Sequence, residues 1–352
     1  MFGDCSSLIS INLSNLSNQK LKFTERMFAD CTKLKSIDLN NFKTENVINM
    51  NSMFLRCTSM EIIDISDFDT TKVTTFNSMF KDCISLKTIN LPKYSTQNLI
   101  SMSHMFSGCK NLLSIELSNL NTSKMNDMDY LFYNCNSLIN VDISKFISKN
   151  PITMSYMFSG CNSLISINFP KLYNKIITKK LAHLFHDCHS LISIDLSIFN
   201  TDKLESMNHM FYNCYRLIFL NISNFNTENV NNMNYLFNGC TSLKSIDASN
   251  FNTKNILSMS YLFQNCYSLT SVNLSSFNTL RATNMKYLFY NCYNLTYVDI
   301  SSFSSNSNST ISLFNNKVPK LGLIKLNMQF YNKIKDNNGI SNWTFDIIDF
   351  EL

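Results

Sequence analysis

One pattern of apolar and polar positions recurs along most of the chain. Residues 34–57 read LKSIDLNNFKTENVINMNSMFLRC. The first part places Ile37 and Leu39 on one side of a short strand and the polar residues between them on the other, because strand side chains alternate. Further on, apolar residues recur at spacings of three and four from Val47 to Cys57, which predicts a helix.

A turn joins the predicted strand to the predicted helix, and a tight return closes the repeat. Thr44 stands where its hydroxyl would cap the helix by accepting from free N–H groups of the first turn. In most repeats Gly, Asn or Asp precedes the cysteine, although Arg56 does so here. Gly and Asn tolerate the left-handed backbone conformation that ends helices. Each repeat therefore reads as strand, turn, helix and return.

The cysteines define the length of the repeat. The 12 cysteines stand 26 residues apart, except that 27 residues separate Cys161 from Cys188. A constant period of this size is typical of a solenoid, in which each unit buries its apolar face against its neighbours. We therefore expect one elongated domain instead of several globular ones.

The chain divides into an array and a C-terminal cap. We assign residues 1–306 to the array, with twelve Cys-marked repeats of which the first is truncated, and residues 307–352 to degenerate C-terminal repeats and a cap. A final apolar segment, residues 345–350, is expected to supply a fourteenth strand. The residues in register for a thirteenth strand are Leu321, Ile324 and Leu326.

The first repeat begins in its middle. Met1 aligns with Met27 of the next repeat, so the first predicted rung lacks its helix. Solenoids need a covered end. We expect Met1 to be an internal methionine of a longer parent chain, and fraying of the first rung is the alternative.

Stacked strands on one side and bulkier helices on the other make a solenoid curve. The predicted fold is a right-handed α/β leucine-rich-repeat solenoid with the form of a horseshoe. A parallel β-sheet lines its inner face, and helices cover its outer face.

The repeat also carries a family resemblance. The strand motif L-x-x-I-x-L and the return M-F-x-x-C-x-S-L resemble the BspA-like family of leucine-rich-repeat surface proteins over about residues 1–303. This resemblance implies a cell-surface or secreted adhesin that binds host matrix or cell-surface proteins. It brings no catalytic residues with it.

Composition excludes several classes of protein. With 45% hydrophobic and 16% charged residues the chain has ample material for a core, so it is not disordered. A net charge of +5 with scattered lysines gives no support to nucleic-acid binding. The sequence has no apolar run long enough for a transmembrane helix, and its opening does not read as a signal peptide. The surface location is therefore inferred from the resemblance alone.

Enzyme motifs are missing from the sequence. Its 6 glycines are too few and too scattered for a phosphate-binding loop, and no G-x-S-x-G or H-E-x-x-H occurs. A regular strand face encloses no pocket that would exclude water. We expect no enzyme activity and no cofactor.

The main candidate site is the polar residue between the two inward-facing residues of each strand, such as Asp38 between Ile37 and Leu39. This position holds Asp, Glu or Asn in every repeat, although the chain is net basic. Such a column would receive a basic segment of a protein ligand or hold Ca²⁺ through oxygen atoms; alternatively, it keeps a solvated sheet face polar. The acidic members are Asp38, Asp64, Glu116, Asp142, Asp195, Asp247 and Asp299.

Tyrosines form a possible second contact surface. Ten of the 15 tyrosines follow residue 200, and tyrosine is enriched where proteins bind one another. The alternative is that these rings pack against neighbouring repeats. The residues concerned are Tyr235, Tyr261, Tyr287, Tyr290 and Tyr293.

Cysteines and histidines offer two weaker candidates for chemistry. A disulfide needs the Cβ atoms of its two cysteines about 3.8 Å apart. Equivalent cysteines on neighbouring rungs stand about 4.8 Å or more apart. We therefore favour free buried thiols over a disulfide framework. His183, His186 and His189 flank Cys188, which makes zinc a candidate, but their spacing favours ordinary surface positions.

Taken together, these patterns indicate a protein-binding scaffold, with a surface adhesin as the first hypothesis. The alternative is an intracellular leucine-rich-repeat interaction module of the same form.

Overall fold

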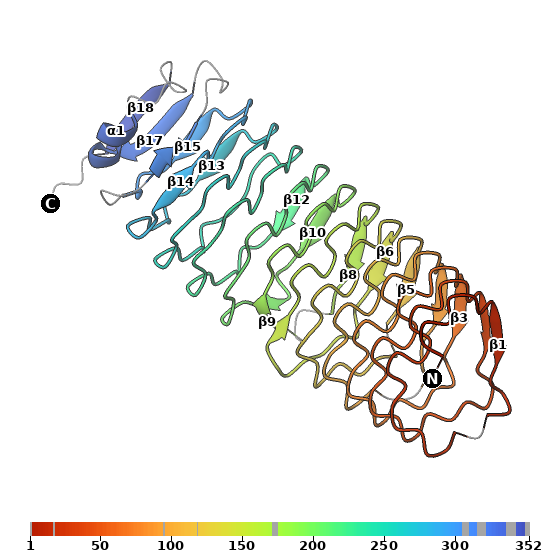
Figure 1. The fold of residues 1–352 in the computed structure, drawn as a ribbon. Coiled ribbons are helices and arrows are strands. Elements are labelled where there is room, and N and C mark those ends of the chain that lie inside the picture. The colour runs from red at the N-terminus through yellow and green to blue at the C-terminus, as the bar shows by residue number, and fades with distance from the viewer. Residues whose placement is uncertain are drawn as a thin grey trace. The chain divides into compact units, whose positions relative to one another are not determined.

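The computed structural model describes residues 2–16, 18–93, 96–117, 119–170, 175–304, 310–314, 322–335 and 343–348. Leu321 and Phe350, expected in the last two strands, lie outside these ranges. The chain forms two compact units, Met1–Ile177 and Thr178–Leu352. Each unit is a β-solenoid of stacked rungs joined by parallel strand pairs (Figure 1).

Unit 1 carries one short strand in each rung and a second strand in one of them. Its sheets follow the orders β1-β2, β3-β4 and β5-β6-β8. The strands are β1 (Ser10–Asn12), β2 (Ser36–Asp38), β3 (Ile62–Asp64), β4 (Thr88–Asn90), β5 (Ser114–Glu116), β6 (Asn140–Asp142), β7 (Ile152–Thr153) and β8 (Ser166–Asn168), and β9 (Ile176–Lys180) crosses into unit 2.

Unit 2 follows the same plan, except that residues 244–248 form no strand and that its last rungs differ. The order β10-β12 precedes the larger sheet β13-β15-β17-β18, and β14 pairs with β16. Its further strands are β10 (Ser193–Asp195), β11 (Phe199–Asn200), β12 (Phe219–Asn221), β13 (Ser271–Asn273), β14 (Asn284–Lys286), β15 (Tyr297–Asp299), β16 (Thr310–Ser312), β17 (Leu323–Asn327) and β18 (Thr344–Ile348).

The repeat sets the strand register. Val141 pairs with Ile115 on one side and with Ile167 on the other, each 26 residues away. The predicted alternation is confirmed in this strand, since Val141 is buried while Asn140 is exposed. Equivalent phenylalanines stack through the core of each unit with ring centroids 5.2–5.8 Å apart.

The prediction of helices on the outer face is wrong. The segment from Val47 to Cys57 consists of turns and one isolated bridge, and α1 (Met328–Ile334) is the one helix in the described part of the chain. The fold is therefore a β-solenoid and not an α/β one.

The reason lies in two left-handed residues per rung. Arg56 before the cysteine has φ 56°, as expected for that position, but Ser52 also has φ 54°. A right-handed helix cannot pass through either residue. Alternate N–H groups instead donate to the next rung, from Ser52 to the carbonyl of Asn77 (2.8 Å) and from Phe54 to that of Met79 (2.9 Å). Apolar spacings of three and four thus arise from successive tight turns.

Thr44, which was expected to cap a helix, is buried, and its hydroxyl has no hydrogen-bond partner among the described residues. Threonines at the same position in later repeats bond to the next rung instead. The Thr96 hydroxyl donates to the carbonyl of Asn121 (3.2 Å) and accepts from the N–H of the same residue (2.6 Å). Thr122 makes the same pair of bonds with Ile147, at 3.1 and 2.9 Å. These side chains are buried, so each hydroxyl satisfies a backbone donor and a backbone acceptor away from water.

The last strands continue the ladder as predicted. β17 pairs in parallel with β15, with Ile324 opposite Val298, and β18 pairs with β17. Helix α1 follows β17, and the side chain of Asn327 caps it by accepting from the N–H of Phe330 (2.8 Å). Trp343 is buried beside this region.

Candidate functional site

The acidic column lies on the solvent side of the strands in unit 1. Asp38, Asp64, Glu116 and Asp142 belong to β2, β3, β5 and β6, and their side chains are exposed or half-buried. Pairing in register places Asp142 between Glu116 and Asn168 of the neighbouring strands. Within each of these sheets the residues of the column therefore pair in register, and their role as a binding site stays a prediction.

Unit 2 brings together less of the predicted column. Asp195 is exposed on β10, and Asp247 is exposed in a stretch, residues 244–248, that forms no strand. Asp299 on β15 is 5% exposed. Lys325 of the next strand lies over it, with Nζ 3.8 Å from Oδ2. Asp299 is therefore not available to a partner, which corrects its place in the candidate site.

The column side chains also hold the turn that follows each strand. Oδ1 of Asp142 accepts from the N–H of Ser144, two residues on, at 2.8 Å. Asparagine does the same, since Asn12 Oδ1 accepts from Ser14 at 2.8 Å. Asp and Asn are interchangeable in this Asx turn because each offers an oxygen at the same place. The same bond is made by Asp38, Asp64, Asp195, Asp247, Asp299, Asn221 and Asn273.

Amides of the next rung bridge two of the carboxylates. Asn90 Nδ2 donates to Asp64 Oδ2 and Asn168 Nδ2 to Asp142 Oδ2, both at 2.9 Å. The bond from Asn90 is the main reason that the pKa of Asp64 lies below its usual value. Hydrogen bonds from Ser144, followed by the one from Asn168, lower the pKa of Asp142. Both carboxylates are therefore ionised at neutral pH.

A shallow hollow lies at the end of β2 and β3. It measures about 240 Å³, and its lining includes Asp38, Asn40, Asp64 and Asp67. Lys93 Nζ stands 3.3 Å from Asp67 Oδ1 and offsets part of the charge. Three carboxylates around one hollow make this end of the strand face a place for a cationic group.

Sequence reasoning missed an apolar column beside the acidic one. Leu113, Ile139 and Ile165 directly precede β5, β6 and β8 and are 50%, 39% and 46% exposed. Backbone bonds from Ile139 to Leu113 (3.1 Å) and from Ile165 to Ile139 (2.9 Å) hold them side by side. Earlier rungs carry the ion pair Glu61–Lys87 at the same position. Comparing the residue before each strand across repeats would have revealed this change.

The tyrosines of the possible second surface pack on one another. Tyr261 stacks on Tyr235 at 4.6 Å and lies tilted against Tyr287 at 5.2 Å. Tyr290 meets Tyr287 edge to face at 5.4 Å. Of the five, Tyr293 is the most exposed, at 41%, and the other four are half-buried. Packing between rungs accounts for the column, and contact with a partner stays a prediction.

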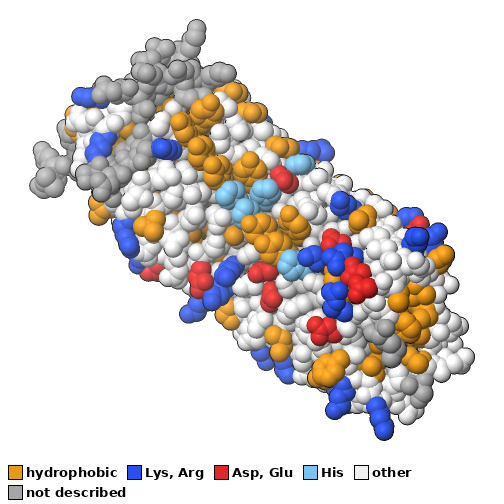
Figure 2. All heavy atoms as spheres, viewed as in Figure 1, with side chains coloured by type: hydrophobic (Ala, Val, Ile, Leu, Met, Phe, Trp, Pro, Cys, Tyr) orange, Lys and Arg blue, Asp and Glu red, His pale blue; other side chains and the backbone are white. Residues whose placement is uncertain are grey.

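The histidine cluster belongs to the same aromatic surface. His183, His186 and His189 stack on His209, Tyr212 and Tyr215 at 4.4, 4.7 and 4.7 Å. Figure 2 shows histidine side chains gathered with hydrophobic ones, a class that includes tyrosine. Among the described residues no group of three or more His, Cys, Asp or Glu side chains is arranged to hold a metal ion. The zinc alternative therefore gains no support.

The cysteines form the expected buried line of thiols. Cys57 Sγ donates to the carbonyl of Phe28, and Cys83 Sγ to that of Phe54, both at 3.1 Å. Burial raises the pKa of Cys292 to about 12. Cys31 to Cys292 are all buried and free, whereas Cys5 is exposed. These thiols fill the core as small apolar groups.

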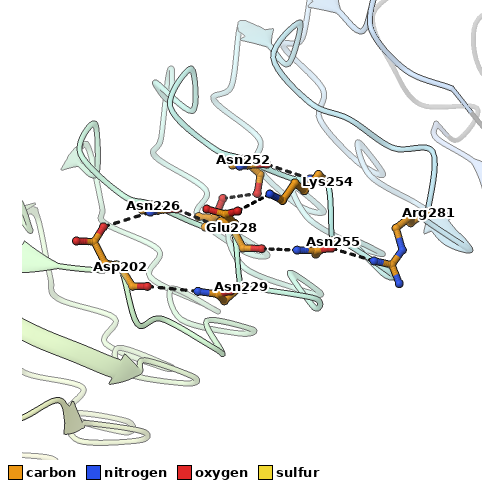
Figure 3. Close-up of polar contacts among 9 residues, drawn as sticks. Asp202, Asn226, Glu228, Asn229, Asn252, Lys254, Asn255 and Arg281 are labelled. Carbon is orange, nitrogen blue, oxygen red and sulfur yellow. Dashed lines mark hydrogen bonds and ion pairs between the residues drawn. The ribbon is translucent and has the colours of Figure 1, made fainter.

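A polar ladder on the turns of unit 2 is also structural. Asn229 Nδ2 donates to the carbonyl of Asp202 (3.3 Å), and Asn255 Nδ2 to that of Glu228 (2.8 Å). Arg281 donates to Asn255 Oδ1 at 2.9 Å. Figure 3 shows these side chains reaching from one rung to the next. They satisfy each other and so offer few free groups to a ligand.

The stacked parallel strands and rung-to-rung bonds define a leucine-rich-repeat-like β-solenoid. The chain belongs to the family described as "Mycoplasma protein of unknown function, DUF285", whose pattern matches residues 1–114, 59–168 and 179–303. No curated protein sequence matches the chain. No helix in the described ranges is long and apolar enough to span a membrane.

Two solved bacterial structures are similar to this chain. A leucine rich cell surface protein from Faecalibacterium prausnitzii A2-165 is 19% identical, over 84% of this chain and 74% of its own, with a TM-score of 0.43. A leucine-rich repeat protein from Bacteroides ovatus ATCC 8483 is 18% identical, over 99% and 86%, with a TM-score of 0.44. Since both scores lie under 0.5, the fold assignment rests on the strand pairing described above.

Proposed function

We propose that this protein is a non-enzymatic scaffold that binds a protein ligand with its strand face. The partner segment is basic and apolar, and the contact surface includes Asp38, Asp64 and Asp142 together with Ile139. The protein acts at the cell surface as an adhesin for matrix or cell-surface proteins of a host. A binding scaffold needs area more than a pocket, and repeats supply area.

The observation that carries this proposal is the pairing of two columns on one face. Leu113, Ile139 and Ile165 are exposed directly before β5, β6 and β8, and Glu116 and Asp142 stand three residues further on in two of these strands. Neither column is needed to fill the core, because both project away from it. A basic segment with apolar side chains would find charge and apolar contact together.

The surface location is supported by the resemblance of the repeats to BspA-like surface proteins. Mild protease treatment of intact cells would remove the protein if it is displayed outside. Survival of the protein in intact cells, with digestion after lysis, would favour the intracellular interaction module instead.

Replacing carboxylates by amides tests the strand face without disturbing its turns. The variant Asp38→Asn/Asp64→Asn/Asp142→Asn keeps every Asx-turn oxygen, because Asn already makes this bond in other rungs. Three Asp→Ala changes would remove those bonds and confuse stability with binding. The probe is a synthetic peptide of alternating lysine and leucine, and affinity is measured at low and high salt.

We expect the triple variant to bind the peptide about tenfold more weakly, a loss of about 1.4 kcal/mol, and with less dependence on salt. The matched control is Glu45→Gln/Glu205→Gln/Glu228→Gln, which removes equal charge outside the strands and should bind as the parent does. Equal affinity of the triple variant and the parent would reject the strand face as the binding surface.

A further inference from the structure

A second hollow lies in unit 1, built by the residues around the cysteine returns and not by the strands. It measures about 350 Å³, at the lower end of ordinary ligand pockets. Its walls include Lys81, Asp82, Lys110, Tyr133 and Asn134. None of these residues belongs to the strand face, so the hollow is independent of the proposed protein-binding surface.

The hollow exists because one rung carries small side chains. Ser107 and Gly108 stand between Lys81-Asp82 of one neighbouring rung and Tyr133-Asn134 of the other. Backbone bonds confirm the order, from the N–H of Asp82 to the carbonyl of Ser107 and from the N–H of Gly108 to that of Tyr133, both 2.7 Å. Large residues on either side of a small pair leave a space one rung wide.

Glycine at 108 lets the Asp82 carboxylate rest against its backbone. Gly108 has φ +77°, and a Cβ there would come within 2.2 Å of Asp82 Oδ1. The carboxylate therefore occupies the place that a side chain would take. This contact holds Asp82 at the wall of the hollow, where its oxygens can accept from hydroxyl groups.

The charged groups of the hollow are not engaged with one another. Lys81, Asp82 and Lys110 make no ion pair within 4.0 Å among the residues that the structure describes. The lining holds two lysines and one aspartate, which leaves a net positive charge. Such a site attracts a ligand with a carboxylate or sulfate.

Aromatic rings complete the wall. Tyr130 stacks on His104 with ring centroids 4.4 Å apart, and Tyr133 lies across Tyr130 at 72° and 5.5 Å. Their edges offer apolar surface, and the phenol hydroxyls and the Asn134 amide offer hydrogen bonds. A ligand that fits has apolar C–H surface, several hydroxyls and one negative charge.

We propose that this hollow binds an acidic sugar, a uronic acid unit of a glycan chain. The sugar carboxylate meets Lys81 and Lys110, and its hydroxyls meet Asp82 and Asn134. An acidic side chain of a peptide would use the lysines but leave the Asp82 carboxylate facing another negative group. The presence of Asp82 in the wall thus favours the sugar over the peptide.

Titration calorimetry on the full chain tests this assignment. The probe is an oligosaccharide of alternating glucuronic acid and N-acetylglucosamine, compared with a neutral N-acetylglucosamine oligomer and with polyglutamate. Ser107→Tyr should fill the hollow and fold normally, because Tyr133, Tyr212 and Tyr290 occupy the same position in other rungs. The matched control is Ser159→Tyr, because Ser159 also stands two residues before a cysteine but does not line the hollow.

We expect the acidic oligosaccharide to bind at least about tenfold more tightly than the neutral one. Ser107→Tyr should weaken binding by a similar factor, while Ser159→Tyr binds as the parent does. The assignment is overturned if the acidic oligosaccharide does not bind or if Ser107→Tyr binds it unchanged. It is equally overturned if polyglutamate binds as tightly and loses its affinity in Ser107→Tyr, because the hollow would then be a peptide site.

Discussion

At the residue scale, Asp142 shows how one side chain serves both fold and surface. Its Oδ1 holds the turn through Ser144, and its charge remains on the strand face. Asp142→Ala should therefore lower the free energy of unfolding by about 1 kcal/mol, whereas Asp142→Asn, which keeps the turn bond and loses only the acceptor for Asn168 Nδ2, should cost less. Thermal melts of the two variants measure the difference. Equal melting temperatures would show that the Asx turn contributes nothing to stability.

Histidines in the aromatic column predict how stability depends on pH. Burial, followed by the charge of His186, lowers the pKa of His209 to about 4. An unfolded chain takes up a proton near the ordinary value of 6.5 while the folded chain does not. Stability is therefore full above about pH 6.5 and falls as the pH drops toward 4. His209→Tyr keeps the ring, as in Tyr235, but should flatten this part of the melting-temperature profile, and an unaltered profile would contradict the assignment.

Exposure of the thiols gives a direct test of the buried line. Cys5 is exposed and the other cysteines are buried, with pKa values raised by burial where a shift is resolved. A thiol reagent should therefore modify about one of the 12 cysteines in the native protein, and Cys5→Ser should abolish that reaction. Rapid modification of several thiols without denaturant would show that the line is open to solvent.

At the element scale, strands were predictable and the outer face was not. The alternation around Ile37 and the period of 26 residues depend on local sequence and on stacking, and both leave a clear pattern. Helices were expected because turns that bury Val47 and Phe54 produce the same spacing as a helix. The left-handed φ at Ser52, or at Tyr130 in its own rung, is unusual for these residue types. Stacking between rungs imposes this left-handed conformation, so the local sequence does not predict it.

Left-handed positions should be sensitive to substitution. Gly239 has φ +75°, and a Cβ would approach Asn213 Oδ1 to 2.5 Å. Gly239→Ala should destabilise the protein by about 1–2 kcal/mol, while Ser242→Ala in the same rung should have little effect. Denaturant unfolding of both variants measures this. A neutral Gly239→Ala would show that the turn at this position is not the one described.

Across the whole molecule, the sequence predicted the position of the candidate surfaces well. It predicted the role of individual residues on those surfaces less well. The acidic column follows from strand alternation, but the burial of Asp299 depends on Lys325 of a later strand. The apolar column at Leu113 escaped notice because it stands just outside the strand motif. The hollow beside Gly108 depends on side-chain sizes in three successive rungs, which become neighbours only once the repeat is stacked.

The apolar column predicts a further effect on binding. Ile139→Lys should fold normally, because Lys35 and Lys87 occupy the same position in other rungs. It should weaken binding of the lysine–leucine peptide about tenfold, since it replaces apolar contact by like charge. Lys35→Gln is the matched control and should not weaken it. Unchanged binding by Ile139→Lys would remove the apolar column from the proposed surface.

Hydrogen exchange of the full chain, with and without the lysine–leucine peptide, tests the central claim most directly. The account predicts that the peptide slows exchange in β2, β3, β5, β6 and β8 and in the residues that precede the last three of these strands. It predicts no change around Tyr133 or along the ladder from Asp202 to Arg281. Protection confined to those turns, with none on the strands, would contradict the claim that the strand face is where this protein meets its partner.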